Sequence, residues 1–297
     1  MIDNSLIFTI SIPTYNRSKL LIRNIENIDR INFDKSKFEV IVVDDGSTDN
    51  TASVISSFST NTSLNLRYIK KENGGKYTAL GRAIREAKGE YFINSDSDDF
   101  LDTECLNNFC QVWNRFNKER NPEIAGVIGQ NYNINQQQIQ GTLYEREGMI
   151  SDPITMRFKK KILGDKIPII KTEILKEFNF PEAINNLKFI PESYILYGVS
   201  SKFDFIYTNK VFQNYNYQND GLTSKIHKYR LDNAYGCYLV YKRYIELIPL
   251  KKTLTGYIRN YINYVRFGLH SKNRIELKSI IDFALYPIGW ILYKNEK

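Results

Sequence analysis

The chain has 297 residues, a formal net charge of +8, 42% hydrophobic residues and 25% charged residues, a globular composition that excludes a disordered or fibrous protein. Its two histidines, His227 and His270, disfavour a zinc site or a histidine-based catalytic triad. Three cysteines without metal-ligand spacing favour a reducing, cytoplasmic setting. The first residues show no basic stretch followed by an apolar run, so we expect no secretory signal.

The first 130 residues alternate short apolar runs with helical patterns. We expect strands at 6–12, 38–43, 64–69, 91–94 and 124–129, and helices at 19–29, 49–58, 76–88 and 103–120. This alternation predicts an α/β protein with a Rossmann-like, mostly parallel central sheet flanked by helices. Ligands of such sheets bind at the carboxyl ends of the strands. Polar clusters follow four of the predicted strands, at 13–17, 44–45, 70–75 and 96–99, which suggests one shared site.

The fourth predicted strand ends in an acidic cluster formed by Asp96, Asp98 and Asp99, with Asp102 just beyond. Carboxylates this close repel one another, so a fold that keeps them together usually supplies a cation. Oxygen ligands without Cys or His suit Mg²⁺ or Mn²⁺ rather than zinc. Such an ion would hold a diphosphate. The alternative is a solvated Asp/Ser turn.

Three other kinds of site fit the spacing less well. An EF-hand loop would need an oxygen-bearing side chain at position 100 and glycine at 101, where the chain has Phe100 and Leu101. A phosphatase that forms an aspartyl-phosphate carries its Asp-x-Asp motif after the first strand, not the fourth. No G-x-G-x-x-G motif follows a predicted strand, which disfavours a dinucleotide-dependent dehydrogenase.

Four segments occur in the order and spacing of family 2 glycosyltransferases. They are Ser-Ile-Pro-Thr-Tyr-Asn-Arg at 11–17, Val-Val-Asp-Asp-Gly-Ser-Thr-Asp at 42–49, Asn-Gly-Gly-Lys at 73–76 and Ser-Asp-Ser-Asp-Asp at 95–99. The chain resembles that family strongly over residues 5–105 and more weakly from there to about 225. The resemblance implies a GT-A fold, a nucleotide-diphospho-sugar donor, a divalent metal, and transfer with inversion at the anomeric carbon.

The resemblance and the strand-end positions together suggest which residues bind the donor. They are Pro13, Thr14, Tyr15, Arg17, Asp44, Asp45, Asn73, Gly75, Lys76, Asp96 and Ser97. Tyr15 can stack on the base or lie at its edge, and Asp44 or Asp45 can accept from the base N–H and a ribose hydroxyl. The segment 73–76 opens a helix, where free backbone N–H groups and a lysine suit a pyrophosphate. The alternative for residues 16, 17 and 76 is that they only form a turn or cap a helix and do not bind the donor.

The resemblance also suggests metal ligands. Asp98 corresponds to the principal ligand, Asp96 contacts the ribose or the metal, and Asp99 orients the site or caps the next helix. The ion, Mn²⁺ or Mg²⁺, would neutralise the diphosphate as the sugar departs.

An inverting transfer also needs a base for the acceptor hydroxyl. The segment 188–194 resembles the region where the family carries its catalytic carboxylate, usually as Glu-Asp. Here the pair is Glu192-Ser193, so Glu192 is the candidate base; Asp165, Glu182 and Asp220 are its rivals. The segment 216–223 resembles the one that covers the donor, and a solvent-facing His227 is the simplest expectation there.

The C-terminal 47 residues are basic and partly apolar. Residues 251–297 hold nine lysines and arginines against three acids, and they contain the apolar run 283–293. That run is too short to span a bilayer, but with its Trp and Tyr it suits a segment on an anionic membrane surface. A terminal helix packed on the domain is the alternative. These basic residues are not part of a recognisable nucleic-acid-binding motif, so we expect no nucleic-acid partner.

These observations predict a GT-A domain at 1–225, with a nucleotide-sugar-binding half at 1–130 and an acceptor half at 131–225. A basic helical segment follows at 226–297, with helices at 229–248 and 253–270. The expected function is inverting transfer from a nucleotide-diphospho-sugar, with UDP as the expected nucleotide, to a saccharide or lipid-linked saccharide of a surface polysaccharide such as capsule. We expect it in the cytoplasm, at the inner face of the cell membrane. The alternative is a nucleotide-sugar-binding module without catalysis.

Overall fold

A ten-stranded mixed sheet forms the centre of the protein, for which a computed structural model describes residues 6–184, 187–215 and 222–296. Four parallel strands make one half: β3 (Asn65–Lys70), β2 (Phe38–Asp44), β1 (Phe8–Thr14) and β4 (Tyr91–Asn94). The order continues through β9 (Lys166–Lys171), β6 (Ile124–Asn133), β10 (Asp204–Tyr215) and β5 (Phe100–Leu101). Two short strands, β7 (Gln138–Ile139) and β8 (Met149–Ser151), pair with β6 and β10.

The strand β9 is antiparallel to both of its neighbours, β4 and β6, so the sheet is mixed at its middle. On either side of β9 the long strands are parallel. The structure confirms the five strands expected in the first 130 residues, and the fifth of them, β6, runs four residues beyond its predicted end.

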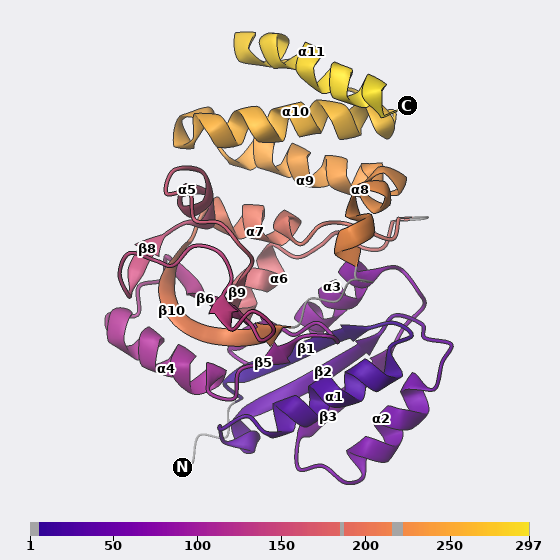
Figure 1. Cartoon of the computed structure of the whole chain (residues 1–297), viewed down its shortest axis with the longest axis vertical. Helices are drawn as coiled ribbons and strands as arrows, with labels where there is room; N and C mark the ends of the chain where they lie inside the picture. Colours follow the sequence, from indigo (N-terminus) through magenta and orange to yellow (C-terminus); the bar gives the residue numbers. More distant parts are fainter. Residues whose placement is uncertain (1–5, 185–186, 216–221, 297) are drawn as a thin grey trace.

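Helices cover both faces of the sheet (Figure 1). One face carries α1 (Ser18–Asp29), α2 (Thr51–Ser59) and α4 (Cys105–Phe116), and the other carries α3 (Lys76–Glu86), α6 (Thr172–Glu177) and α7 (Ser193–Ser200). Successive side chains of β2 point to opposite faces of the sheet. Val40 and Val42 belong to the hydrophobic core under α1, α2 and α4, whereas Ile41 and Val43 belong to the core under α3, α6 and α7. The α/β class and the GT-A-like layering expected from the sequence are therefore confirmed.

Five further helices complete the described structure, and four of them follow the last strand, β10. They are the short helix α5 (Pro153–Phe158), then α8 (Leu222–Asp232), α9 (Ala234–Leu247), α10 (Leu254–His270) and α11 (Ile280–Asn295), with 3₁₀ turns at Lys35–Lys37 and Leu250–Lys252. The prediction of a single helix at 229–248 is wrong at its start, because the helical conformation is interrupted at Asn233, between α8 and α9. The side chain of Asn233 accepts from the backbone N–H of Lys188 and donates to the carbonyl of Tyr229.

Helices α9, α10 and α11 stack one above the other at the end of the molecule opposite α1 and α2 (Figure 1). Their shared core is rich in tyrosine, including Tyr238, Tyr261 and Tyr264. Helix α9 also contacts α7, which joins this stack to the sheet domain. Within the described residues, none of the helices combines the length and apolarity needed to cross a membrane.

Candidate active site

The candidate donor-binding residues meet at the carboxyl ends of β1, β2 and β4. Thr14 and Asp44 are register partners at the ends of β1 and β2, and the N–H of Asp45 donates to the carbonyl of Thr14 (2.9 Å). Pro13 lies one residue before the end of β1, and Tyr15, just beyond it, is 47% exposed. The hydroxyl oxygen of Thr14 is buried without a hydrogen-bond partner among the described residues.

The two aspartates after β2 have different surroundings. Asp44 is fully buried and accepts from the Ser47 N–H (2.7 Å) and the Tyr68 hydroxyl (2.5 Å). Burial, together with the Asp44 carboxylate, raises the pKa of Tyr68, so this hydroxyl stays a donor at neutral pH. Both Asp44 oxygens are therefore engaged within the protein.

Asp45 organises the glycine loop before α3. Its carboxylate accepts from the N–H groups of Gly74 (2.9 Å) and Gly75 (2.7 Å) and from the Lys71 ammonium (2.6 Å). The Asn73 amide donates to the same carboxylate (3.1 Å). A single buried side chain thus fixes the conformation of the segment that precedes the helix N-terminus.

Gly75 brings the acceptor half against this loop. Its φ is +91°, which favours glycine, and a Cβ there would lie 1.9 Å from the carbonyl oxygen of Lys188. The Lys188 ammonium donates to the carbonyl of Asn73 (2.6 Å). The segment before α7, which carries Glu192, therefore packs directly on the glycine loop.

A buried asparagine of α1 holds the acidic turn after β4. The amide of Asn24 donates to the carbonyls of Asp96 (2.6 Å) and Asp99 (2.7 Å) and to the Ser95 hydroxyl (3.0 Å). Sequence reasoning missed this residue. The available signal was a polar residue on the apolar face of α1, between Leu21 and Ile25 and fully buried like them.

A residue of β10 that sequence reasoning also missed closes the acidic turn from the other side. The Gln213 amide donates to a carboxylate oxygen of Asp99 (2.6 Å), and β10 pairs with β5, directly after the turn. Burial, with the nearby Asp96 and Asp98 charges, raises the pKa of Asp99 to about 7. Asp99 therefore loses its proton less readily than an ordinary aspartate.

Two basic side chains face the other aspartates. The Arg17 guanidinium lies 2.9 Å from Asp98 and 3.5 Å from the Ser97 hydroxyl. The Lys76 ammonium lies 2.6 Å from Asp96, whose pKa the lysine holds below its usual range against the effect of burial. The same ammonium lies 2.6 Å from Oε1 of Glu192. Lys76 therefore joins the donor half to the candidate base.

The acidic turn suits a divalent ion by donor chemistry. Among the described residues, no group of three or more His, Cys, Asp or Glu side chains is arranged to hold a metal. Asp96 and Asp98 are each about one-third exposed, and each is paired with a basic side chain. Carboxylate oxygens are ligands that a hard cation prefers, but Asp96 and Asp98 would have to leave these ion pairs to bind one.

Among the described residues, the rival carboxylates form no hydrogen bond or ion pair with this cluster. Asp165 and Glu182 are exposed, and Asp220 lies outside the described residues, as does most of the expected closing segment 216–223. His227 lies on α8, 3.0 Å from Glu296 near the C-terminus, with its side chain 68% exposed. The structure therefore places His227 facing solvent, as expected.

Comparison with known proteins matches residues 9–172 to the sequence model of Glycosyl transferase family 2. The poly(ribitol-phosphate) beta-N-acetylglucosaminyltransferase TarS of Staphylococcus aureus is 32% identical over 99 residues, 33% of this chain and 17% of TarS. A poly(ribitol-phosphate) beta-glucosyltransferase of Bacillus spizizenii is 26% identical over 212 residues, 68% of this chain and 32% of that protein. The chain thus spans a third or less of the length of these relatives.

Solved structures share the fold. Residues 1–349 of S. aureus TarS in complex with UDP-GlcNAc superimpose with a TM-score of 0.67 at 17% identity, covering 96% of this chain and 79% of that one. A mannosyltransferase of Pyrobaculum calidifontis in complex with GDP-Man and Mn²⁺ gives a TM-score of 0.60 at 19% identity, covering 98% and 83%. At these identities the likeness shows the GT-A fold.

Proposed function

The chain belongs to glycosyl transferase family 2, and from this premise we propose that it is an inverting glycosyltransferase. It moves a sugar from a nucleotide-diphospho-sugar to a saccharide or lipid-linked saccharide of a cell-surface polymer. The observation that carries the proposal is the bridge made by Lys76, which contacts both Asp96 and Glu192 at 2.6 Å. Through it a donor-binding edge and a candidate base form one site. The UDP-GlcNAc in the TarS structure favours UDP as the nucleotide.

The donor lies across the carboxyl ends of β1, β2 and β4 in this proposal. Tyr15, Asp44 and Asp45 stand at the nucleoside end, where Asp45 acts mainly by shaping the glycine loop. The helix N-terminus at Gly75, together with Lys76 and Arg17, faces the diphosphate. Asp98 and Asp96 would hold Mn²⁺ or Mg²⁺, which supplies electrostatic stabilisation of the departing diphosphate.

Glu192 acts as the general base. Its carboxylate takes the proton of the acceptor hydroxyl as that oxygen attacks the anomeric carbon, while the bond to the diphosphate breaks and the nucleoside diphosphate leaves. Glu192 lies just before α7 with its side chain 51% exposed, so an acceptor can reach it. When Lys76 turns to the donor diphosphate, Glu192 is released from its ion pair.

The polymer acceptor places the enzyme at the inner face of the cell membrane in this proposal. The two relatives named as poly(ribitol-phosphate) glycosyltransferases support a polymer acceptor. Because the chain spans only part of the length of those relatives, we propose only the class of acceptor, a saccharide or lipid-linked saccharide.

A nucleotide-sugar-binding module without catalysis is the second candidate. Donor hydrolysis and transfer, measured over a panel of UDP- and GDP-sugars with Mn²⁺ and with a chelator, separate the two. An enzyme consumes one donor of the panel in a metal-dependent manner. Thermal stabilisation by a nucleotide sugar without any turnover identifies the binding module.

A further inference from the structure

Helix α11 packs on the protein with one face only. Asp282, Leu285 and Gly289 are its buried residues, and they lie on the side that contacts α10. A Cβ at Gly289 would stand 2.6 Å from Cβ of Val265, so the two helices approach closely there. A capping box between Ser279 and Asp282 fixes the start of the helix, and Asp282 also accepts from the Tyr257 hydroxyl (2.8 Å). The rotation of α11 about its axis is therefore determined.

The outward face of α11 is apolar along nearly its full length. Its large exposed hydrophobic side chains are Ile280 (89%), Phe283 (63%), Ile288 (45%), Trp290 (44%), Ile291 (51%) and Leu292 (37%). Ala284 and Pro287 lie between them and are also exposed. Scattered exposed apolar residues are ordinary on a protein surface, but a contiguous patch of this kind marks an interaction site.

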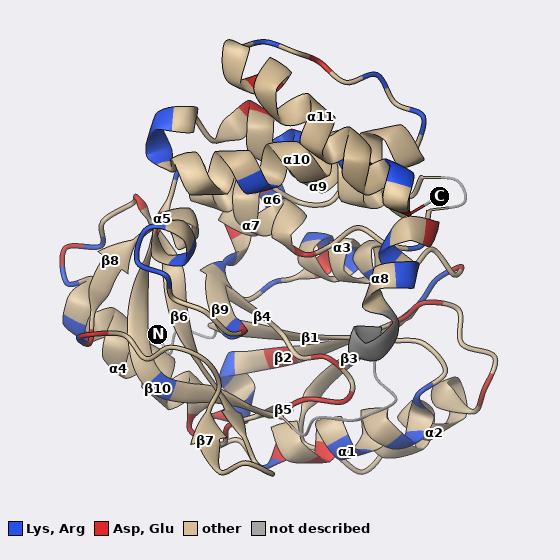
Figure 2. Cartoon of the chain, turned by 45° about the horizontal axis from the view of Figure 1, so that its top comes forward, with Lys and Arg blue, Asp and Glu red and all other residues tan. Residues whose placement is uncertain are grey.

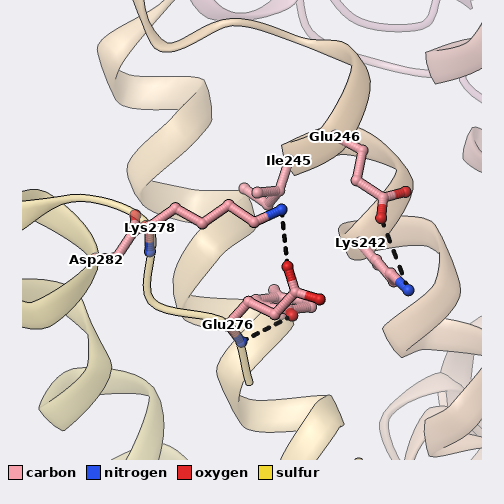
Figure 3. A pocket seen from close by; sticks show the side chains of 7 residues that line it. Lys242, Ile245, Glu246, Glu276, Lys278 and Asp282 are labelled. Carbon is pink, nitrogen blue, oxygen red and sulfur yellow. Dashed lines mark hydrogen bonds and ion pairs between the residues drawn. The ribbon is translucent and has the colours of Figure 1, made fainter. Parts of the chain in front are cut away.

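Exposed charges around this face are mainly positive. Of the acids in 271–296, Asp282 is buried and Glu296 is held by Arg266 and His270, so only Glu276 is exposed. Four basic residues in the same range are exposed: Lys272, Arg274, Lys278 and Lys294. The Lys278 ammonium pairs with Glu276 at 2.7 Å (Figure 3), and the Lys294 ammonium stands 5.3 Å above the Trp290 ring. Figure 2 shows the basic residues of the α10–α11 loop at the outer end of the molecule.

We propose that the outward face of α11 lies in the headgroup region of an anionic membrane, parallel to its surface. This rests on the proposed function, which places the acceptor at a membrane. With 16 residues the helix is about 24 Å long, shorter than the ~30 Å hydrocarbon core, so it lies on the bilayer instead of crossing it. An apolar face flanked by lysine, arginine and tryptophan has the chemistry of an interfacial helix.

A second copy of the chain fits this face less well than a membrane. A parallel pair of α11 helices would bring the two Lys294 side chains together, whereas an antiparallel pair would bring Lys294 of one copy toward the Lys278–Glu276 ion pair of the other. Like charges at the rim of an apolar contact oppose pairing. An anionic lipid surface is attracted by the same residues.

Trp290 provides a direct probe, because the chain has only one other tryptophan, Trp113, which packs against the sheet core. The 297-residue chain is mixed with vesicles of phosphatidylcholine alone or with added phosphatidylglycerol, and flotation and tryptophan emission are recorded. We expect flotation only with the anionic vesicles, a blue-shifted emission, and quenching by brominated acyl chains. Trp290→Phe should abolish the emission change while leaving flotation largely intact.

Matched variants distinguish binding through α11 from nonspecific adsorption of the protein to vesicles. Phe283→Ser with Ile291→Ser should lower anionic-vesicle binding by more than tenfold, whereas Leu163→Ser, at a 54% exposed leucine outside the helical stack, should leave it unchanged. Arg274→Gln and Lys294→Gln, which each remove one positive charge, should each lower it about fivefold. Transfer to a soluble acceptor should be unchanged in all of these variants. A wild-type chain that binds anionic vesicles but transfers no sugar would count against the proposed function and not against this surface.

Two results would overturn the proposal. The first is the absence of binding between the wild-type chain and anionic vesicles, or equal binding by the wild-type chain and the variant that carries both Phe283→Ser and Ile291→Ser. The other is a lipid-free dimer in sedimentation velocity that the same double variant dissociates, because the face would then be an interface between copies.

Discussion

The ammonium of Lys76 lies 2.6 Å from Oε1 of Glu192, and this contact crosses from the glycine loop at the start of α3 to the segment before α7. The same ammonium holds Asp96 at 2.6 Å. A diphosphate bound at the α3 N-terminus would compete for this lysine. We therefore expect donor binding to free Glu192 for the acceptor, which orders the two binding steps.

Replacing Glu192 tests its role as the base. Glu192→Gln keeps the shape of the side chain but cannot take the acceptor proton, so transfer should fall by roughly 10²-fold or more while donor affinity persists. Transfer rates and donor-induced thermal shifts measure the two effects. Asp165→Asn and Glu182→Gln are the matched controls. Full transfer by Glu192→Gln together with loss in a control would show that the base is misassigned.

Removing the Lys76 charge should weaken donor binding. Lys76→Met takes away one charge-assisted contact to the diphosphate, which corresponds to a rise in the donor KM of about tenfold or more. Lys76→Arg retains the charge and should recover part of that loss. Steady-state kinetics with varied donor measure both. A donor KM that stays at the wild-type value in Lys76→Met would remove this lysine from the diphosphate site.

The metal prediction concerns Asp98. Its ion pair with Arg17 is about one-third exposed and should contribute about 0–1 kcal/mol to stability, so Asp98→Ala should melt near the wild-type temperature. Activity should fall by about 10²-fold or more, because charge stabilisation of the leaving diphosphate is a large catalytic term. Activity is measured across a Mn²⁺ titration. Near-normal turnover of this variant in chelated buffer would contradict the metal assignment.

Asn24 should act as a positioning residue for the acidic turn. Asn24→Asp keeps the volume but cannot donate to the carbonyls of Asp96 and Asp99, which should cost about 1–3 kcal/mol of stability. The Mn²⁺ concentration for half-maximal activity should also rise. Leu21→Ala, a buried change on the same helix, should lower stability by about 2–5 kcal/mol and leave the Mn²⁺ dependence unchanged. Equal Mn²⁺ dependence in wild type and Asn24→Asp would reduce Asn24 to a purely structural residue.

The strand-end positions of the candidate site could be predicted from the sequence because they follow local patterns. Apolar runs such as 38–43 end at polar residues, and parallel strands bring those ends to one edge. Asn24 and Gln213 could not be found in this way, since their partners Asp96 and Asp99 lie far along the chain and no local period encodes the contact. The break at Asn233 was missed for the same reason, because its side chain bonds to the distant Lys188 N–H.

The orientation of the C-terminal helix α11 could not be predicted from composition either. Its apolar run was equally consistent with a helix packed on the protein and with one on a membrane. The structure shows that α11 packs through Leu285 and Gly289 and exposes Phe283 and Ile291. Composition could not distinguish these faces without the helix phase that Ser279 sets.

The most direct test of the central claim is product analysis by NMR after incubation with a nucleotide-sugar panel, Mn²⁺ and saccharide acceptors. We expect one transferred sugar whose anomeric configuration is opposite to that of the donor, with its formation abolished by chelation and by Glu192→Gln. A product that retains the donor configuration, or a donor that stabilises the protein yet is never consumed, would contradict it.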